Sequence, residues 1–261
     1  ASDVYKRQLK YCFSHSIRCY MSPKISDIIL LGTDRIHLFD TPLLMCRNQG
    51  LSMEQRAAKR VLDIIVSGLG IIVSSPIMLI IAIAVKAYDG GPVFYLQDRL
   101  TYQGKEFRIR KFRSMCVDSE KNGARLASKH DSRITPVGHV LRNLHLDELP
   151  QLFNVFMGDM SLVGPRPERD VIMQEYEQEI PEFHYRLKVK AGLTGYAQVY
   201  GKYNTTPYDK LKLDLFYIEN YSFLLDIKLL FMTVKIFFQK EVSEGVDDNQ
   251  KNALKDSEDK K

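Results

Sequence analysis

The most prominent feature of the hydropathy pattern is one long run without charge, which covers residues 64–85. Its non-apolar members are only serines, glycines and one proline, Pro76. A helix of this length spans about 33 Å, which is enough to cross the hydrocarbon layer of a membrane. Uncharged runs of this length favour a membrane helix, and a buried helix of a soluble protein is the alternative interpretation.

Pro76 lies near the middle of this run and is expected to kink the helix, because proline removes a backbone hydrogen bond. Ser74 and Ser75 precede it, and their hydroxyls are placed to bind the carbonyl groups that the proline leaves free. Basic residues flank both ends of the run, which places both flanks on the cytoplasmic side. The pattern therefore predicts a re-entrant helix over residues 60–88 that enters the membrane, breaks at Ser75-Pro76 and returns.

The first 50 residues follow a different pattern from the rest of the chain. Two short apolar runs, 28–31 and 36–39, indicate β-strands, and the residues between them indicate a turn. We interpret residues 1–50 as the end of an upstream α/β domain together with a linker. The chain is then expected to be part of a longer protein.

Four further segments follow the uncharged run. Residues 92–113 predict a β-hairpin, and residues 136–157 predict helix with an interruption near the middle. Residues 224–240 carry an apolar stripe at helical spacing, which predicts an amphipathic helix on the membrane surface or against the core. The last segment, 241–261, has no apolar periodicity and is predicted to be disordered. The predicted fold class is α+β, mainly helical, with a small hairpin or sheet, a re-entrant membrane helix and amphipathic interfacial helices.

Charge adds one inference about partners. The whole chain has a net charge of +5. The last 21 residues carry −3, so the preceding 240 residues carry +8. A basic body indicates an anionic partner, such as a phosphate, a lipid headgroup or a nucleic acid. Among the four cysteines, Cys12 and Cys19 could share a helix face with His15, but a fourth metal ligand is lacking. Reduced thiols are therefore the favoured interpretation.

Candidate chemistry centres on two adjacent carboxylates, Asp147 and Glu148. Lys111 and Arg113 alternate along a predicted strand and so share one of its faces. Arg166 lies between two prolines, which fix a stiff loop that presents the guanidinium. Each feature also has an ordinary interpretation: a helix-start acid pair, a solvated basic face and a structural turn.

Taken together, two carboxylates, several cations and a membrane segment are typical of phosphate chemistry on a lipid. Such chemistry needs Mg²⁺ and basic side chains to neutralise a diphosphate. An enzyme of this kind is the favoured interpretation. The alternatives are a membrane scaffold that binds anionic lipid and a nucleic-acid-binding protein. The long uncharged run disfavours nucleic acid as a partner, and a scaffold gives no reason for Asp147-Glu148 among cations.

At this point the sequence resembles the bacterial sugar transferases, or monotopic phosphoglycosyl transferases, which begin glycan assembly on polyprenyl phosphate. The resemblance covers about residues 59–240. It rests on Lys59-Arg60 with Asp63, Ser75-Pro76, Gly91 to Val93, Gln97 with Arg99, Lys111 to Met115, Leu146 to Gln151, Asn154-Val155, Gly158 to Pro167, Gly192 to Gly195 and Ala197 to Val199. Thr101, His139 and His145 depart from the usual pattern of the family.

The resemblance implies a transferase domain over residues 51–240, with residues 1–50 as the end of an upstream Rossmann-like domain. It implies that Asp147 attacks the sugar-linked phosphate of a UDP-sugar, releases UMP, and passes the sugar phosphate to polyprenyl phosphate. It also implies that Glu148, with Asp147, holds Mg²⁺, and that Lys111, Arg113 and Arg166 bind phosphate. The implied location is the bacterial inner membrane and its lipids, with the catalytic groups on the cytoplasmic face, in exopolysaccharide, capsule, O-antigen or glycoconjugate assembly. No nucleic acid partner is implied, and a homo-oligomer is left open.

Overall fold

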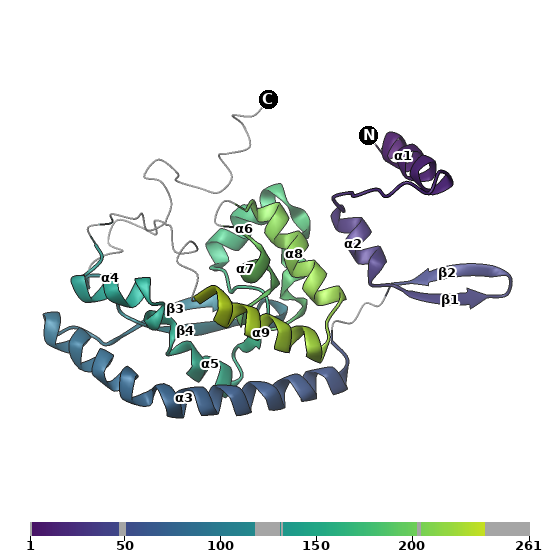
Figure 1. The fold of residues 1–261 in the computed structure, drawn as a ribbon. Coiled ribbons are helices and arrows are strands. Elements are labelled where there is room, and N and C mark those ends of the chain that lie inside the picture. Colours follow the sequence, from purple (N-terminus) through teal and green to yellow (C-terminus); the bar gives the residue numbers. More distant parts are fainter. Residues whose placement is uncertain (1, 47–50, 118–130, 132, 203–204, 238–261) are drawn as a thin grey trace.

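A computed structural model describes residues 2–46, 51–117, 131, 133–202 and 205–237, and these are mainly helical with three small sheets (Figure 1). In chain order the elements are α1 (Ser2–Ser14), α2 (Ile25–Leu31), β1 (Asp34–Leu38), β2 (Thr41–Met45), α3 (Met53–Asp89), β3 (Phe94–Leu100), η1 (Tyr102–Gly104), β4 (Glu106–Phe112), α4 (Pro136–Asn143), η2 (Leu146–Glu148), α5 (Gln151–Met157), β5 (Ser161–Val163), α6 (Asp170–Glu179), η3 (Pro181–Lys188), β6 (Gly192–Thr194), α7 (Tyr196–Tyr200), α8 (Pro207–Glu219) and α9 (Phe223–Phe237). The elements marked η are 3₁₀ turns.

The N-terminal segment corrects one prediction. Residues 28–31 belong to helix α2 and not to a strand, whereas the second apolar run forms β1, which pairs with β2 in an antiparallel hairpin. The helix forms because the Asp27 carboxylate accepts a hydrogen bond from the backbone N–H of Lys24 (2.9 Å) and Ile28 is buried against α8. The interpretation of residues 1–50 as the end of an upstream domain stays a prediction.

Helix α3 begins with a capping box and ends at a glycine. The Ser52 hydroxyl accepts from the backbone N–H of Gln55 (3.2 Å), and the Gln55 side chain accepts from the backbone N–H of Ser52 (2.9 Å). Gly90 ends the helix in the left-handed region, with φ of 70°. The uncharged run is therefore the central part of a 37-residue helix that is longer than the predicted range 60–88.

The predicted interruption at Ser75-Pro76 is not a break in the helix. Pro76 lies inside α3, and the helix continues to Asp89. The carbonyl four residues before the proline belongs to Ile72, and the Ser75 hydroxyl donates a hydrogen bond to it (2.8 Å). Ser74 donates in the same way to the carbonyl of Gly70 (2.6 Å). The two serines therefore bind helix carbonyls, as predicted, and this compensation lets the helix pass through the proline.

Helix α3 is long and apolar enough to cross a membrane, and only 11% of its apolar stretch is buried. A core helix of a soluble protein would be mostly buried, so this exposed fraction favours a membrane contact. Both ends of α3 are bound to the body. Lys59 pairs with Asp226 of α9 (2.6 Å), and Asp89 pairs with Arg113 beyond β4. The helix accordingly lies along the body in Figure 1. The re-entrant path stays a prediction.

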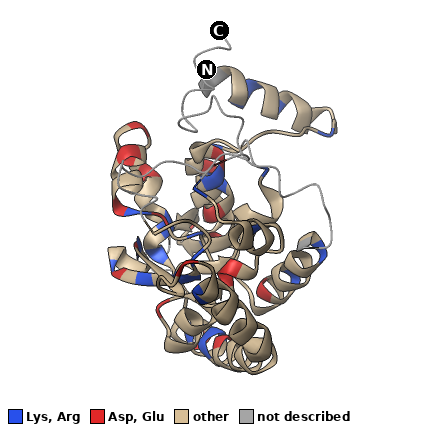
Figure 2. Ribbon diagram, turned by 90° about the vertical axis from the view of Figure 1, so that its left-hand side faces the viewer, with Lys and Arg blue, Asp and Glu red and all other residues tan. Residues whose placement is uncertain are grey.

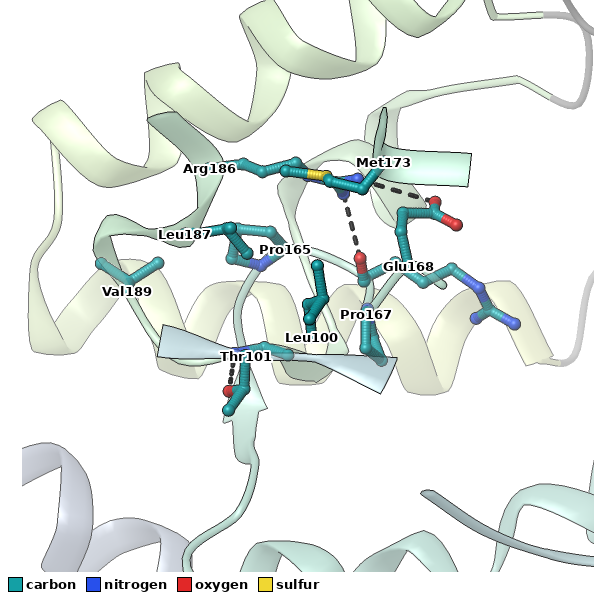
Figure 3. Close-up of a pocket in the computed structure, with 11 residues that line it drawn as sticks. Leu100, Thr101, Pro165, Pro167, Glu168, Met173, Arg186, Leu187 and Val189 are labelled. Carbon is teal, nitrogen blue, oxygen red and sulfur yellow. Dashed lines mark hydrogen bonds and ion pairs between the residues drawn. The ribbon is translucent and has the colours of Figure 1, made fainter. Parts of the chain in front are cut away.

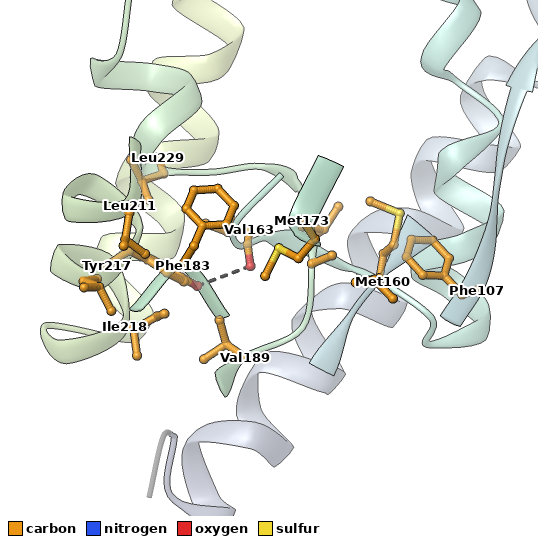
Figure 4. Packing of buried hydrophobic residues seen from close by; sticks show 14 of the residues in the cluster. Phe107, Met160, Val163, Met173, Phe183, Val189, Leu211, Tyr217, Ile218 and Leu229 are labelled. Carbon is orange, nitrogen blue, oxygen red and sulfur yellow. Dashed lines mark hydrogen bonds between the residues drawn. The ribbon is translucent and has the colours of Figure 1, made fainter. Parts of the chain in front are cut away.

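The predicted hairpin at residues 92–113 is confirmed, because β3 and β4 pair antiparallel through a turn at η1. Beside it, β5 and β6 form a short parallel pair. The main core collects apolar side chains from the sheets and the C-terminal helices (Figure 4). They include Phe107, Met160, Val163, Met173, Phe183, Leu211, Tyr217 and Leu229.

Helix α9 covers the described part of the segment, residues 224–240, for which an amphipathic helix with an apolar stripe was predicted. Leu229 is fully buried and Leu225 is half-buried, so this stripe packs against the core. The outward side of α9 is also apolar, because Leu224 and Phe231 are largely exposed. An interfacial position for α9 stays a prediction, and the predicted disordered tail, 241–261, lies outside the described residues. Figure 2 shows basic and acidic segments interspersed over the ribbon in that view.

Candidate active site

The two candidate carboxylates lie in η2, a short turn between α4 and α5, which confirms the predicted interruption in the helical segment. His145 starts the turn in the left-handed region, with φ of 52°, a conformation that costs energy for a residue other than glycine. Pro150 caps α5 two residues after Glu148. The turn leaves Asp147 9% exposed, so its carboxylate lies near the surface of the body but is mostly enclosed.

Two of the predicted phosphate-binding cations meet at one carboxylate oxygen. Lys111 Nζ lies 2.6 Å from Oε1 of Glu148, and Arg166 Nη2 lies 3.2 Å from the same atom. These residues come from β4, from the loop after β5 and from η2. The Arg166 side chain is 51% exposed, so its guanidinium is open to a ligand on the side away from Glu148.

Asn154 explains why Lys111 lies beside η2. Its side-chain oxygen accepts from the backbone N–H of Arg110 (3.0 Å), and its side-chain nitrogen donates to the carbonyl of Arg108 (2.8 Å). Helix α5 is thereby fixed to β4 as an additional strand would be. Because η2 leads directly into α5, this contact places the next residue of the strand, Lys111, against Glu148.

The Arg166 loop is placed by a close approach of two backbones. The backbone N–H of Gly164 donates to the carbonyl of Thr194 (2.8 Å), as an extension of the β5–β6 pair. A Cβ at Gly164 would lie 2.4 Å from the carbonyl oxygen of Lys190, so only glycine fits there. The two prolines that flank Arg166 are buried while Arg166 is exposed. The sequence therefore directs this one side chain out of an otherwise buried loop.

The two carboxylates have opposite electrostatic surroundings. Burial raises the pKa of Asp147 above its ordinary value, Lys111 opposes this rise, and the negative charge of Glu148 adds to it. Burial also disfavours ionisation of Glu148, but Arg166 and Lys111 outweigh it and hold the pKa of Glu148 well below its usual range. Burial lowers the pKa of Lys111, against the effect of Glu148. Glu148 is therefore a fixed anion bound to two cations, whereas Asp147 is the more readily protonated group.

Within the described part of the chain, no residue donates a hydrogen bond to the carboxylate of Asp147. One further cation acts on it that was not among the predicted site residues. Arg142, in the last turn of α4, donates to the hydroxyl of Ser114 (2.9 Å), and its positive charge lowers the pKa of Asp147. The available signal was a basic residue five positions before the acid pair, at the end of a predicted helix.

Arg113 does not join the other predicted site residues. Strand β4 ends at Phe112, so Arg113 no longer follows the alternation that put it on the face of Lys111. Its guanidinium is 7% exposed and pairs with Asp89 at the end of α3. This contact gives Arg113 a structural partner, and the phosphate-binding role that the resemblance implied for it stays a prediction.

The two carboxylates suit Mg²⁺ by the chemistry of their donor atoms. Mg²⁺ is usually bound by one or two carboxylates and completed by water and substrate phosphate. Asp147 has a carboxylate without a hydrogen-bonding partner in the described structure, and Lys111 and Arg166 both use only Oε1 of Glu148. Among the described residues, no group of three or more His, Cys, Asp or Glu side chains gathers to hold a metal. An ion at this position would therefore need oxygen ligands from the substrate.

Comparisons with known proteins add independent information. The family described as bacterial sugar transferase matches residues 54–240. The UDP-N-acetylgalactosamine-undecaprenyl-phosphate N-acetylgalactosaminephosphotransferase of Aeromonas hydrophila is 44% identical over 180 residues, which are 68% of this chain and 43% of that protein. The UDP-glucose:undecaprenyl-phosphate glucose-1-phosphate transferase of Klebsiella pneumoniae is 43% identical over 208 residues, 78% of this chain and 43% of that protein. The undecaprenyl-phosphate galactose phosphotransferase of Salmonella typhimurium is 36% identical over 237 residues, 84% of this chain and 49% of that protein. The chain thus spans less than half the length of each of these relatives.

Proposed function

This chain belongs to the bacterial sugar transferase family, and on that basis we propose that it transfers a sugar 1-phosphate from a UDP-sugar to polyprenyl phosphate and releases UMP. The observation that carries the proposal is the arrangement of η2, where Asp147 has no hydrogen-bonding partner among the described residues and Glu148 binds Lys111 and Arg166 through one oxygen. A carboxylate without neighbouring cations would be repelled by a diphosphate. Cations fixed beside it remove that repulsion.

We propose a reaction in two displacements. In the first, an Asp147 carboxylate oxygen attacks the sugar-linked phosphorus, and the bond from that phosphorus to the UMP oxygen breaks, so that UMP leaves with the electron pair. In the second, an oxygen of polyprenyl phosphate attacks the same phosphorus and Asp147 leaves as a carboxylate. Each displacement is easier than one direct transfer between two anions.

The surrounding residues have separate tasks in this proposal. Lys111 and Arg166 neutralise the diphosphate, and the exposed guanidinium of Arg166 can bind two phosphate oxygens at once. The positive charge of Arg142 reduces the electrostatic repulsion between Asp147 and the diphosphate. Glu148 keeps the two cations in place, since its own ionisation is strongly favoured by them. Asp147 and Glu148 would hold Mg²⁺, which supplies charge neutralisation on the phosphate oxygens when bound.

The membrane arrangement follows from the same geometry. We propose that the exposed apolar side of α3 lies in the bacterial inner membrane, and that both of its ends stay on the cytoplasmic side. The proposal is supported by the two ion pairs that tie these ends to one body, Lys59–Asp226 and Arg113–Asp89. The exposed Phe156 and Met157 at the end of α5, beside α3, extend the apolar surface. Polyprenyl phosphate could then approach η2 from the lipid.

The deciding experiment measures UMP release. The full chain in detergent or lipid nanodiscs is given Mg²⁺, undecaprenyl phosphate and a panel of UDP-sugars, because the named relatives use N-acetylgalactosamine, glucose and galactose donors. UMP release that requires both the UDP-sugar and the polyprenyl phosphate would support the proposal. A chain that is folded and membrane-bound but releases no UMP with any donor would refute it.

A further inference from the structure

The loop that carries Arg166 is fixed through its backbone carbonyl groups. Four consecutive carbonyl oxygens, those of residues 165–168, each accept a hydrogen bond from outside the loop. In order, the donors are the backbone N–H of Gly192 (2.8 Å), Nη2 of Arg186 (3.0 Å), Nη1 of Arg99 (3.1 Å) and the backbone N–H of Leu100 (3.0 Å). Most buried carbonyls are satisfied by backbone groups. Here two of the four donors are arginine side chains, so the position of the loop depends on them.

Arg186 is the donor that binds the carbonyl of Arg166 itself. Its side chain is 5% exposed and packs over the ring of Phe183, with the guanidinium carbon 4.9 Å from the ring centre. The same Nη2 atom lies 2.8 Å from a carboxylate oxygen of Asp214, and Nη1 lies 3.6 Å from Glu168. Figure 3 shows Arg186 and Glu168 meeting beside the loop. One planar guanidinium thus joins η3, α8 and the Arg166 loop.

Asp214 is the buried carboxylate that pairs with Arg186 in this cluster. It is 1% exposed, and burial raises its pKa to about 6 against the opposing charge of Arg186. The other charged groups that act on it are Glu168 from the loop and Lys210 from α8. A buried ion pair is a weak way to stabilise a fold, because well-packed apolar residues often serve as well or better. The Arg186–Asp214 pair has a role besides stability, because the Arg186 guanidinium also donates a hydrogen bond to the backbone carbonyl of Arg166.

We propose that Arg186 is a positioning residue of the transfer reaction, which holds the backbone of Arg166 and so sets where the Arg166 guanidinium meets the diphosphate. The inference rests on the proposed function, in which Arg166 binds phosphate. Arg186 is buried, whereas Arg166 is exposed, so Arg186 affects the substrate only through its contact with Arg166. Lysine is not expected to replace Arg186, because its single ammonium nitrogen cannot lie at the Arg166 carbonyl and Asp214, as Nη2 does, and beside Glu168, as Nη1 does, at the same time.

The test is a double-mutant cycle on the full chain in nanodiscs, with UMP release as the readout. Arg186→Lys is expected to lower kcat/KM for the UDP-sugar about 10- to 100-fold, the size of effect that a misplacement near 1 Å produces. Arg166→Gln is expected to lower it as well. In the double variant Arg166→Gln/Arg186→Lys, the second substitution should add little further loss, because Arg186 acts through Arg166. A purely structural role would instead give losses that multiply.

Two further variants complete the design. Arg108→Lys changes an exposed arginine of the β4 hairpin and should keep wild-type kcat/KM, as the matched control. Asp214→Asn removes the negative charge that pairs with Arg186, and its loss of kcat/KM should also be non-additive with that of Arg166→Gln. This second cycle tests the inference if the Arg186→Lys variant does not fold. Multiplying losses in both cycles, or a wild-type kcat/KM in folded Arg186→Lys, would overturn the inference. Absence of UMP release from the wild-type chain would overturn the proposed function itself.

Discussion

Asp147 and Glu148 are adjacent in the chain, but their surroundings shift their pKa values in opposite directions. Glu148 is bound by two cations and stays ionised, whereas Asp147 is mostly buried and feels the negative charge of its neighbour. Pairs of carboxylates with separated pKa values commonly have separate roles in a reaction. In the proposed mechanism, the fixed anion organises the cations and the other carboxylate reacts.

Activity should therefore depend on pH through Asp147. Attack requires the carboxylate form, so kcat/KM should rise as pH increases through a pKa that lies above the ordinary aspartate value. Glu148→Gln removes a like charge that raises this pKa, so the acid limb should move to lower pH even though overall activity falls. The measurement is kcat/KM against pH for both proteins, with Glu179→Gln in α6 as an exposed control. A limb that moves to higher pH in Glu148→Gln would contradict this assignment.

Replacement of the proposed nucleophile gives the most direct test of the chemistry. Asp147→Asn keeps the shape of the side chain but removes its nucleophilic oxygen, so UMP release should fall by about a thousandfold or more. Asp98→Asn, an exposed carboxylate on β3, should retain wild-type turnover. Mass spectrometry of the wild-type chain after incubation with UDP-sugar alone should detect a phosphosugar adduct that is absent from Asp147→Asn. Retained turnover in Asp147→Asn would require another nucleophile.

Arg113 should behave as a structural residue and not as a phosphate ligand. Arg113→Gln removes the ion pair with Asp89 and leaves that carboxylate with the backbone N–H of Gly91 as a donor (3.1 Å), so we expect a lower unfolding temperature. The KM for the UDP-sugar should change less than in Lys111→Gln. The two are compared by thermal unfolding in nanodiscs and by steady-state kinetics. Equal increases in KM, without loss of stability, would restore the phosphate role for Arg113.

Both ends of α3 should be accessible from the same side of the membrane. Glu54 and Tyr88 are exposed near the two ends of the helix, and each end is tied to the body. Single cysteines at these positions, in a background without Cys12, Cys19, Cys46 and Cys116, are labelled with an impermeant maleimide in vesicles of known orientation. The proposed re-entrant path predicts that both are labelled from the cytoplasmic side. Labelling from opposite sides would show that α3 crosses the bilayer.

Sequence patterns predicted the elements that depend on local chemistry. The uncharged run, the hairpin and the interrupted helix around Asp147 follow from hydropathy, turn residues and a proline, and these are local signals. The family resemblance grouped Lys111 and Arg166 with Glu148 in one site, and the structure brings the three side chains together. The apolar run at residues 28–31 was assigned wrongly to a strand, because a run of four apolar residues does not distinguish strand from helix until its packing partner, here α8, is known.

Other features could not be predicted because they depend on where elements end or meet. The alternation of Lys111 and Arg113 holds only inside a strand, and β4 ends between them. The contact of Arg186 with Arg166 joins residues 20 positions apart in different elements, through a backbone carbonyl that has no sequence signature. Helix α3 continues through Pro76, where the Ser75 hydroxyl binds the carbonyl of Ile72, and this contact depends on a side-chain rotamer that composition does not specify.

The attachment of α3 at both of its ends has a consequence for the lipid. A helix that crosses a bilayer as a free rod adjusts to thicker or thinner membranes by tilting. A helix fastened at Lys59 and at Asp89 has no such freedom, so in the proposed arrangement its immersion depth and the height of η2 above the acyl chains are set together by the protein. Turnover in bilayers of different acyl-chain length should accordingly vary little, because the lipid has to deform around the protein while the distance between catalytic groups and headgroups stays constant.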